Sequence, residues 1–534
     1  MPVKTKQNKP PLSPEEKIFR RNFWMFPIGT IGRDFLFNFF NGYLLSFILL
    51  TKNLTAAQFA SITVIIICAR IFDAMNDPIM GGIVENTRSR FGKYKPWQLL
   101  GAVLTGVVII LLFNLPLYGW NFIGMLAASY FLFSITFTMN DISYWGMMPT
   151  LTSDAHNRNK LTSATQIFAG IGGAISSTLV PVFTTGNIGT AAFGSVSRAF
   201  GVFSIVAATF MVGFQLFTIF GVVEQKLPTP RIKAPRLKFK DIFKCILKND
   251  QLLWAAICLL LFNIGTNAFT GGLTTMYIYF EFGYDGMLTV LFAALSAVMG
   301  ALFTLFFPIL CKKWGRTKVL LITSTLAMLG YIAILFIGLF VPNTGGFDLD
   351  LFGFHFHFTL KFILLVIANM TTGINGMYII QTINMANSVE YNELRTGKRE
   401  ESLIFSLRSL TNKMGSAIAQ GVISLVYVIS GVLLFTNRIS DIENAYSHAG
   451  LTAEEAETKL SEIGSVLHSV PEKNKHILLI CMCVIPVVFI LVALILHKRF
   501  CKLDEAKMDE INRILAERHA AEAKAETQIE NADA

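Results

Sequence analysis

Charged residues are scarce in this sequence: Asp, Glu, Lys and Arg make up only 15% of its 534 residues, whereas hydrophobic residues make up 53%. Soluble domains carry roughly 25% charged residues, so this shortage excludes an ordinary water-soluble protein and indicates a chain that crosses a membrane many times. The formal net charge of +10 comes from basic residues spread over short turns, without interleaved aromatic residues. That distribution excludes nucleic acid as a partner.

Cysteines and catalytic motifs are also sparse. The seven cysteines lie in apolar runs (Cys68, Cys258, Cys481, Cys483) or beside basic segments (Cys245, Cys311, Cys501). An external disulfide framework is therefore not expected. The sequence has no His-rich metal cluster, nucleophile elbow or phosphate loop, which argues against an alternative reading as a membrane enzyme or sensor. The polar first 17 residues lack the apolar core of a signal peptide, so we expect no cleavage there.

Twelve apolar runs are each long enough to cross a bilayer as a helix, which needs about 20 residues. Alternate turns between them are basic: Arg88, Arg90, Lys93 and Lys95; Arg158 and Lys160; Lys312, Lys313, Arg316 and Lys318; Arg395, Lys398 and Arg399. Because short cytoplasmic turns carry the excess of Lys and Arg, both termini are predicted to be cytoplasmic. The sequence predicts an all-α multi-pass protein of the cell membrane, inner or plasma.

The two halves of the chain repeat each other. Residues 89–95 match residues 312–318 at an offset of 223, as expected for a transporter built from related halves. The predicted domains are a cytoplasmic tail (1–21), a six-helix bundle (22–224), a cytoplasmic linker (225–250), a second bundle (251–500) with an external loop (435–475), and a cytoplasmic tail (501–534). Asp73 and Asp77 map to Ser296 and Gly300, so a cation site is expected in the first half only.

The second apolar run contains acids that need a reason to be there. Arg70, Asp73, Asn76 and Asp77 fall within an arc of roughly 120° on one helix face. A charge inside the membrane costs about 2.5 to 3.5 kcal/mol, and two neighbouring carboxylates also repel each other. A positive species should therefore lie between them: Na+, which prefers oxygen ligands, or a proton. The alternative is a salt bridge with Arg70 that only stabilises the bundle.

The stretch from Asp73 to Trp97, with its acids, glycines and Pro96-Trp97 in step, resembles the melibiose permeases and the wider glycoside-pentoside-hexuronide:cation symporter family. The resemblance implies a major facilitator fold with twelve helices in two six-helix halves. It also implies that a sugar moves together with Na+, Li+ or H+ by alternating access.

The resemblance places functional residues as follows. The cation site falls on Asp73, Asn76, Asp77 and Thr138, with Na+ at Asp73 and Asp77. The sugar contacts fall on Arg33, Asp34, Asp141, Tyr144, Trp145, Gln166, Tyr378 and Lys413. The candidate gate consists of Arg158, Glu390, Arg399 and Glu401. Trp145 could instead anchor the end of a span, and Tyr378 could be core packing.

The chain departs from the family pattern at several of these positions. Gln166 stands where the melibiose permeases have an Arg, and Tyr378 stands in place of a Trp. Asn387 and Glu390 replace two Asp near the candidate inner gate. We therefore expect a substrate range that differs from that of a galactoside carrier.

The sequence as a whole predicts a symporter that couples Na+, H+ or Li+ to uptake of a glycoside, an oligosaccharide or a related sugar. Its partners would be the sugar, the cation and the bilayer, with no further cofactor, and it would act as a monomer. A cation-coupled lysolipid transporter of the same fold is an alternative. The external segment from 438 to 473 is read as a solvated helix, the alternative being a cover for the outer mouth. The tail from 503 could lie on the membrane surface or a partner.

Overall fold

A computed structural model describes residues 14–152, 154–223, 249–351, 354–397, 401–447 and 451–533. The amino-terminal helices are α1 (Pro14–Thr51), α2 (Ala56–Asn86), α3 (Lys95–Asn114), α4 (Gly119–Met147), η1 (Met148–Thr150), α5 (Ala155–Thr184), α6 (Gly186–Phe193) and α7 (Val196–Gly221). The predicted linker, residues 225–250, lies outside the described residues except for its last two.

The carboxy-terminal helices are α9 (Asp250–Ala268), the π turn η2 (Phe269–Leu273), α10 (Thr274–Phe282), α11 (Gly286–Trp314), α12 (Arg316–Phe340), α13 (Leu360–Thr372), α14 (Gly376–Thr396), α15 (Glu401–Ile429), α16 (Val432–Ala445), α17 (Ala453–His468), α18 (Glu472–Phe500) and α19 (Glu505–Asp533). A small antiparallel hairpin, β1 (Gly346–Leu351) and β2 (Phe354–Thr359), joins α12 to α13.

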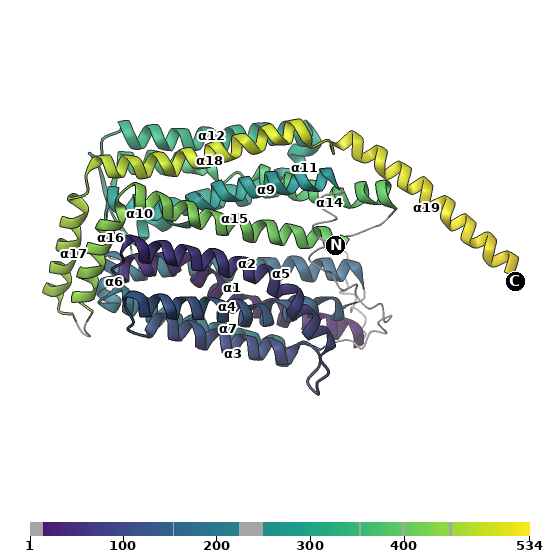
Figure 1. The fold of residues 1–534 in the computed structure, drawn as a ribbon, viewed down its shortest axis with the longest axis horizontal. Helices are drawn as coiled ribbons and strands as arrows, with labels where there is room; N and C mark the ends of the chain where they lie inside the picture. Colours follow the sequence, from purple (N-terminus) through teal and green to yellow (C-terminus); the bar gives the residue numbers. More distant parts are fainter. Residues whose placement is uncertain are drawn as a thin grey trace, which may run out of the picture.

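The long helices form one elongated bundle (Figure 1). In the described part, 11 helices are long and apolar enough to cross a membrane, or 12 if α15 and α16, which meet at 88°, count as one span. The all-α membrane fold predicted from the sequence is confirmed. The first half (α1 to α7) packs mainly on itself, with α1 against α5 and α7, and the second half packs mainly around α9, α15 and α18.

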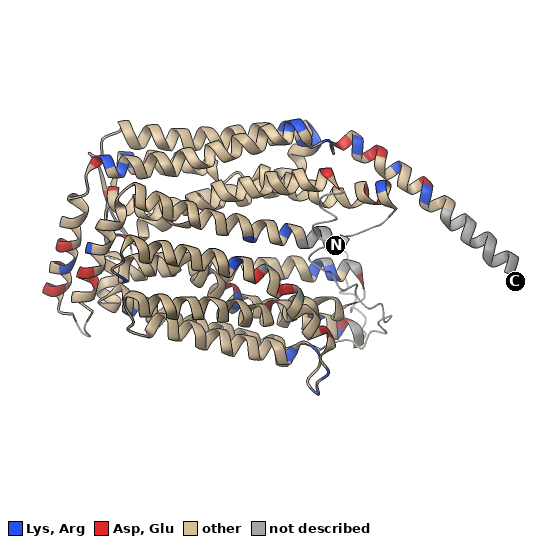
Figure 2. Ribbon diagram, in the orientation of Figure 1, with Lys and Arg blue, Asp and Glu red and all other residues tan. Residues whose placement is uncertain are grey.

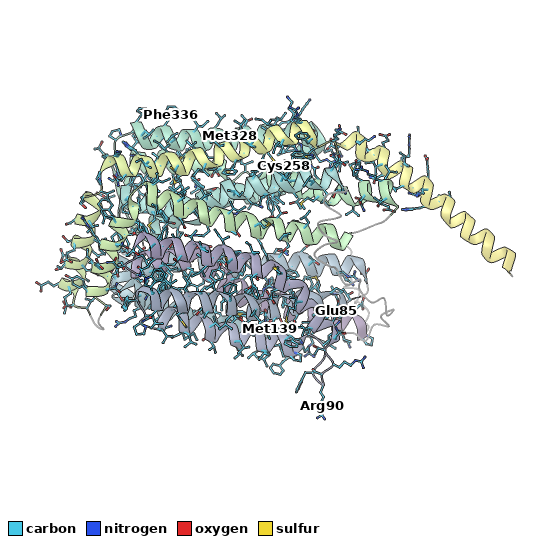
Figure 3. All side chains as sticks on the ribbon, viewed as in Figure 1. Glu85, Arg90, Met139, Cys258, Met328 and Phe336 are labelled. Atoms are coloured by element: carbon cyan, nitrogen blue, oxygen red, sulfur yellow. The ribbon has the colours of Figure 1, made fainter. Side chains whose placement is uncertain are left out.

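The α2 helix has one face suited to lipid and an opposite face directed toward the bundle. Ile71, Met75, Ile79 and Ile83 recur every four residues and are 45% to 63% exposed, so they form a stripe suited to lipid. Asp73 and Asp77 lie on the opposite face, toward the bundle. Other surface positions follow the same rule: Phe336 of α12 points away from the bundle (Figure 3).

Charged residues gather mostly at the two ends of the bundle (Figure 2). At one end, called here the capped end, α6, α16 and α17 lie together (Figure 1). At the other, called here the terminal end, α1 begins and α18 ends, and the turn with Arg90 projects beyond the helices (Figure 3).

A buried ion pair holds the cap in place. The Lys459 ammonium of α17 lies 2.8 Å from the Glu443 carboxylate of α16, and both side chains are 1% exposed. Lys459 also donates to the Gly194 carbonyl at 2.8 Å, and the Val196 N–H donates to Glu443 at 3.0 Å. Tyr284 of the second half donates to the other oxygen of Glu443 at 3.2 Å. The expectation of a solvated helix is wrong, because Lys459 and Glu443 tie α17 to both halves.

We expect Lys459→Met to destabilise the folded protein by about 3–5 kcal/mol, because it leaves the buried Glu443 carboxylate without its cation. A lower unfolding temperature of the detergent-purified protein would show this. Lys473→Met is the matched control and should unfold like the wild type, because Lys473 is exposed near the start of α18. Equal unfolding temperatures for both variants would mean that the pair does not hold the cap.

The carboxy-terminal tail packs on its own chain. Leu503, Met508, Ile511 and Leu515 form a buried cluster against Tyr391 and Leu394 of α14. His519 adds a contact of 2.7 Å to Glu393. The apolar face that the sequence assigned to a membrane surface or a partner is thus covered, in this structure, by α14.

Candidate functional site

The two acids of α2 meet hydroxyl groups of α4. Thr138 Oγ1 donates toward Asp73 Oδ1 at 3.3 Å and toward Asp77 Oδ1 at 3.2 Å, and Ser134 Oγ donates to Asp73 Oδ1 at 2.8 Å. The structure therefore brings together three of the four residues predicted for the cation site and adds Ser134. The spacing of Ser134 and Thr138, one turn apart on α4, is a signal that could have revealed the missing residue.

The fourth predicted residue, Asn76, is placed differently. Its side-chain amide donates to the Ser134 carbonyl at 3.4 Å, and the residue is 8% exposed. Neither carboxylate accepts a hydrogen bond from Asn76 among the bonds of the described residues. Asn76 thus orients α4 against α2 in this structure.

A cation from the second half lies between the two carboxylates. Lys413 of α15 places its ammonium 2.9 Å from Asp73 Oδ2 and 2.5 Å from Asp77 Oδ2. The sequence required a positive species here, but it assigned Lys413 to the sugar. Two carboxylates one turn apart repel each other, and an ammonium in contact with both relieves that repulsion.

Arg70 does not take this role. Its guanidinium donates to the Asn41 side chain of α1, and within the described residues it forms no ion pair with Asp73 or Asp77. The alternative of a salt bridge between Arg70 and these acids is therefore wrong for this structure.

A second charged cluster lies nearby on α1 and α4. Arg33 is 3% exposed and pairs with Asp34 at 2.8 Å and with Asp141 at 3.1 Å. Its guanidinium lies over the rings of Tyr144 (4.8 Å) and Trp145 (5.2 Å), close enough for cation–π attraction. Asp141 follows Thr138 by one helical turn, so the two clusters are neighbours on α4.

Tyr144 is fully buried in this conformation, so its assignment as a sugar contact stays a prediction. Its ring stacks on Phe26 at 4.2 Å, and its hydroxyl donates to the Phe26 carbonyl at 2.5 Å. The Tyr144 ring packs against the Arg33 guanidinium. The side chains of Asp34, Asp141 and Trp145 are partly exposed.

The remaining predicted residues are scattered. Gln166 is exposed on α5. Tyr378 of α14 is half-buried, and its hydroxyl accepts a long hydrogen bond of 3.4 Å from Arg408. Arg408 was not among the residues predicted from the sequence. Arg158 is exposed and reaches the Thr152 carbonyl of its own half at 3.5 Å. Glu390 is half-buried on α14; Arg399 and the side chain of Glu401 lie outside the described residues.

A central cavity of about 790 Å³ lies between the two halves. Its polar lining is dominated by amides and hydroxyls, with the cations Arg70 and Lys413; the amides are Asn38, Asn41, Asn267 and Asn412. Among the predicted sugar contacts only Lys413 belongs to this lining, so Gln166 lies outside the cavity in this conformation and its role as a sugar contact stays a prediction. The sequence alone could not identify these Asn residues as cavity-lining, because a single amide in an apolar run can equally be buried in the protein core.

The fold defined by these helices is that of the major facilitator transporters. The chain superimposes on the nucleoside transporter NupG with a TM-score of 0.54 at 14% identity, covering 84% of this chain and 98% of that one. A bacterial homologue of the lysosomal transporter spinster, in an inward-facing conformation, also gives a TM-score of 0.54, at 12% identity over 92% of this chain and 99% of that one.

Residues 25–505 match the family described as MFS/sugar transport protein, and the chain belongs to that family. It is 28% identical to the raffinose carrier protein of Pediococcus pentosaceus over 76% of this chain, and 24% identical to the putative glycoside/cation symporter YagG of Escherichia coli over 86% of this chain and 87% of YagG. The match spans only 62% of the raffinose carrier's length. The resemblance seen around Asp73 is confirmed, and a transport family contradicts the enzyme alternative.

Proposed function

We propose that the protein is a secondary active symporter that carries a glycoside or oligosaccharide together with a cation by alternating access. The observation that carries this proposal is the contact of Lys413, from the second half, with Asp73 and Asp77 of the first half at the wall of the central cavity. The Lys413 side chain thus contacts the candidate cation site, lines the candidate solute cavity and lies at the interface between the two halves, which must move in alternating access. The relatives named as raffinose carrier and glycoside/cation symporter support a sugar as the solute.

The coupling cation would be Na+, with H+ and Li+ as the other candidates, held by Asp73, Asp77, Thr138 and Ser134. Carboxylate and hydroxyl oxygens suit a small hard cation, so the residues fit. The Lys413 ammonium and the coupling cation neutralise the same carboxylates and therefore replace one another. A solute that draws Lys413 into the cavity would favour cation binding, and by linkage the cation would favour the solute to the same degree.

We orient the capped end outward in the cell membrane, with both termini in the cytoplasm, because the basic turns lie at the terminal end. Contacts between the halves then lie on the outer side: Thr63 donates to Ser424 at 2.7 Å, Asn53 to Asp441 at 2.9 Å, and Thr185 pairs with the Tyr279 hydroxyl at 3.0 Å. Tyr279 also lines the central cavity. These contacts hold the two halves together on the proposed outer side of the cavity in this conformation.

Uptake of radiolabelled lactose and raffinose into proteoliposomes tests the proposal. We expect accumulation above the outside concentration when an inward Na+, Li+ or proton gradient is imposed, and equilibration alone without one. Liposomes lacking the protein are the control. Failure to move either sugar, together with transport of a labelled lysolipid, would replace the proposal by the lysolipid alternative; the amide and hydroxyl lining favours the sugar.

A further inference from the structure

A second chamber lies beside the central cavity, within the second half of the protein. It measures about 520 Å³ and lies among α9, η2, α10, α11 and α13. The chamber adjoins the central cavity, because five residues line both spaces: Thr270, Thr275, Thr289, Ala293 and Ala297. Each space alone falls within the range of about 300–1,000 Å³ that small-molecule sites occupy.

A break in the first span of this half forms the junction. Within η2, Gly271 has φ −84° and ψ 17°, and Gly272 has φ 139°, so the helix is interrupted. Only glycine adopts that φ at little cost, and a Cβ at Gly272 would also lie 3.0 Å from the Tyr427 hydroxyl. Non-helical backbone at membrane depth is tolerated where it faces protein or a wet cavity, as it does here.

The chamber is lined by both polar and apolar side chains, and none of its described lining residues carries a formal charge. Asn369, Asn375 and a series of Thr hydroxyls line it, together with the aromatic rings of Phe269, Phe292 and Tyr331. An aliphatic ligand would leave the remaining acceptor capacity of these hydroxyls unused. A carboxylate or phosphate would find no cation there.

The hydroxyls are arranged to accept hydrogen bonds. Thr270 donates to the Thr266 carbonyl at 3.0 Å, Thr274 to the Phe269 carbonyl at 2.7 Å, and Thr304 to the Gly300 carbonyl at 2.8 Å. A hydroxyl has one proton to donate and two lone pairs, so each of these oxygens keeps acceptor capacity for a ligand. A surface of acceptors with aromatic faces complements the donor hydroxyls and C–H faces of uncharged sugar rings.

We propose that the chamber is a binding subsite for the distal part of a neutral oligosaccharide whose first ring lies in the central cavity near Lys413. This inference rests on the proposed sugar transport and adds to it the class of substrate: an uncharged chain of more than two rings, bound by both halves. Asp34, Asp141 and Trp145 of the first half do not line either space.

Filling the chamber tests the inference. Ala301 of α11 lines the chamber but not the central cavity, so Ala301→Trp should fill part of the chamber while leaving the central cavity unchanged. Val298→Trp is the matched control, since Val298 lies on the same helix, 57% exposed on its lipid-facing side. The readout is the ratio of kcat/KM for raffinose to kcat/KM for lactose in proteoliposomes, with a digalacturonate as acidic competitor.

We expect Ala301→Trp to lower this ratio at least tenfold, Val298→Trp to leave it unchanged, and the acidic competitor to have little effect on the wild type. If Ala301→Trp does not fold, the double variant Thr274→Val, Thr304→Val removes two acceptors at nearly constant volume and should lower the ratio in the same direction. An unchanged ratio in the variant that folds, or a wild type that moves lactose but not raffinose, would overturn the subsite and leave sugar symport standing. A wild type that moves neither sugar would instead contradict the proposed function.

Discussion

Asp73→Cys and Asp77→Cys should each reduce solute accumulation to the outside concentration. Either change removes one of the two carboxylates that the Lys413 ammonium and the Thr138 hydroxyl contact. Lys413 alone can then neutralise the remaining carboxylate. No unpaired negative charge is left to bind the coupling cation. Uptake by right-side-out membrane vesicles under an inward Na+ gradient measures this effect.

Solute exchange without a gradient separates loss of coupling from loss of the protein. A folded variant that has lost only coupling still exchanges labelled solute for unlabelled solute across the membrane. Asp509→Cys, at an exposed position on α19, is the matched control and should accumulate solute like the wild type. Accumulation at the wild-type level by both Asp73→Cys and Asp77→Cys would show that these acids do not couple the cation.

The second large effect is expected at Arg33. Arg33→Met removes a buried cation from two carboxylates, Asp34 and Asp141, and from two aromatic rings. Breaking a buried ion pair by removing one partner costs about 3–5 kcal/mol. The partial exposure of both acids places the expected loss toward the lower end of that range.

A double-mutant cycle identifies the cause. Adding Asp141→Asn to Arg33→Met neutralises one of the stranded acids and should restore part of the lost unfolding free energy. Arg20→Met, at an exposed position near the start of α1, provides the control and should behave like the wild type. If Asp141→Asn restores nothing, the loss comes from packing of the Arg33 side chain on Tyr144 and Trp145 and not from charge.

Local sequence patterns were sufficient to predict the class of protein and the two acids of the candidate cation site, Asp73 and Asp77. The apolar runs, the basic turns and the stretch from Asp73 to Trp97 are properties of neighbouring residues, and they predicted the helical membrane fold and the family. Helical periodicity likewise predicted that Asp73 and Asp77 share a face, since residues four apart on a helix are neighbours. The need for a positive species between them followed from the energy of charge in a membrane.

The identity of that positive species could be learned only from the tertiary structure. Lys413 lies 336 residues beyond Asp77 and reaches it because α15 packs on α2, a contact that no local pattern encodes. The same holds for the burial of Tyr144 under Arg33, for the pairing of Lys459 with Glu443, and for the threonine-lined chamber. In each case the sequence determined which groups must be neutralised or bonded, because desolvation is a property of the group itself. The packing of distant helices decided which partner does it.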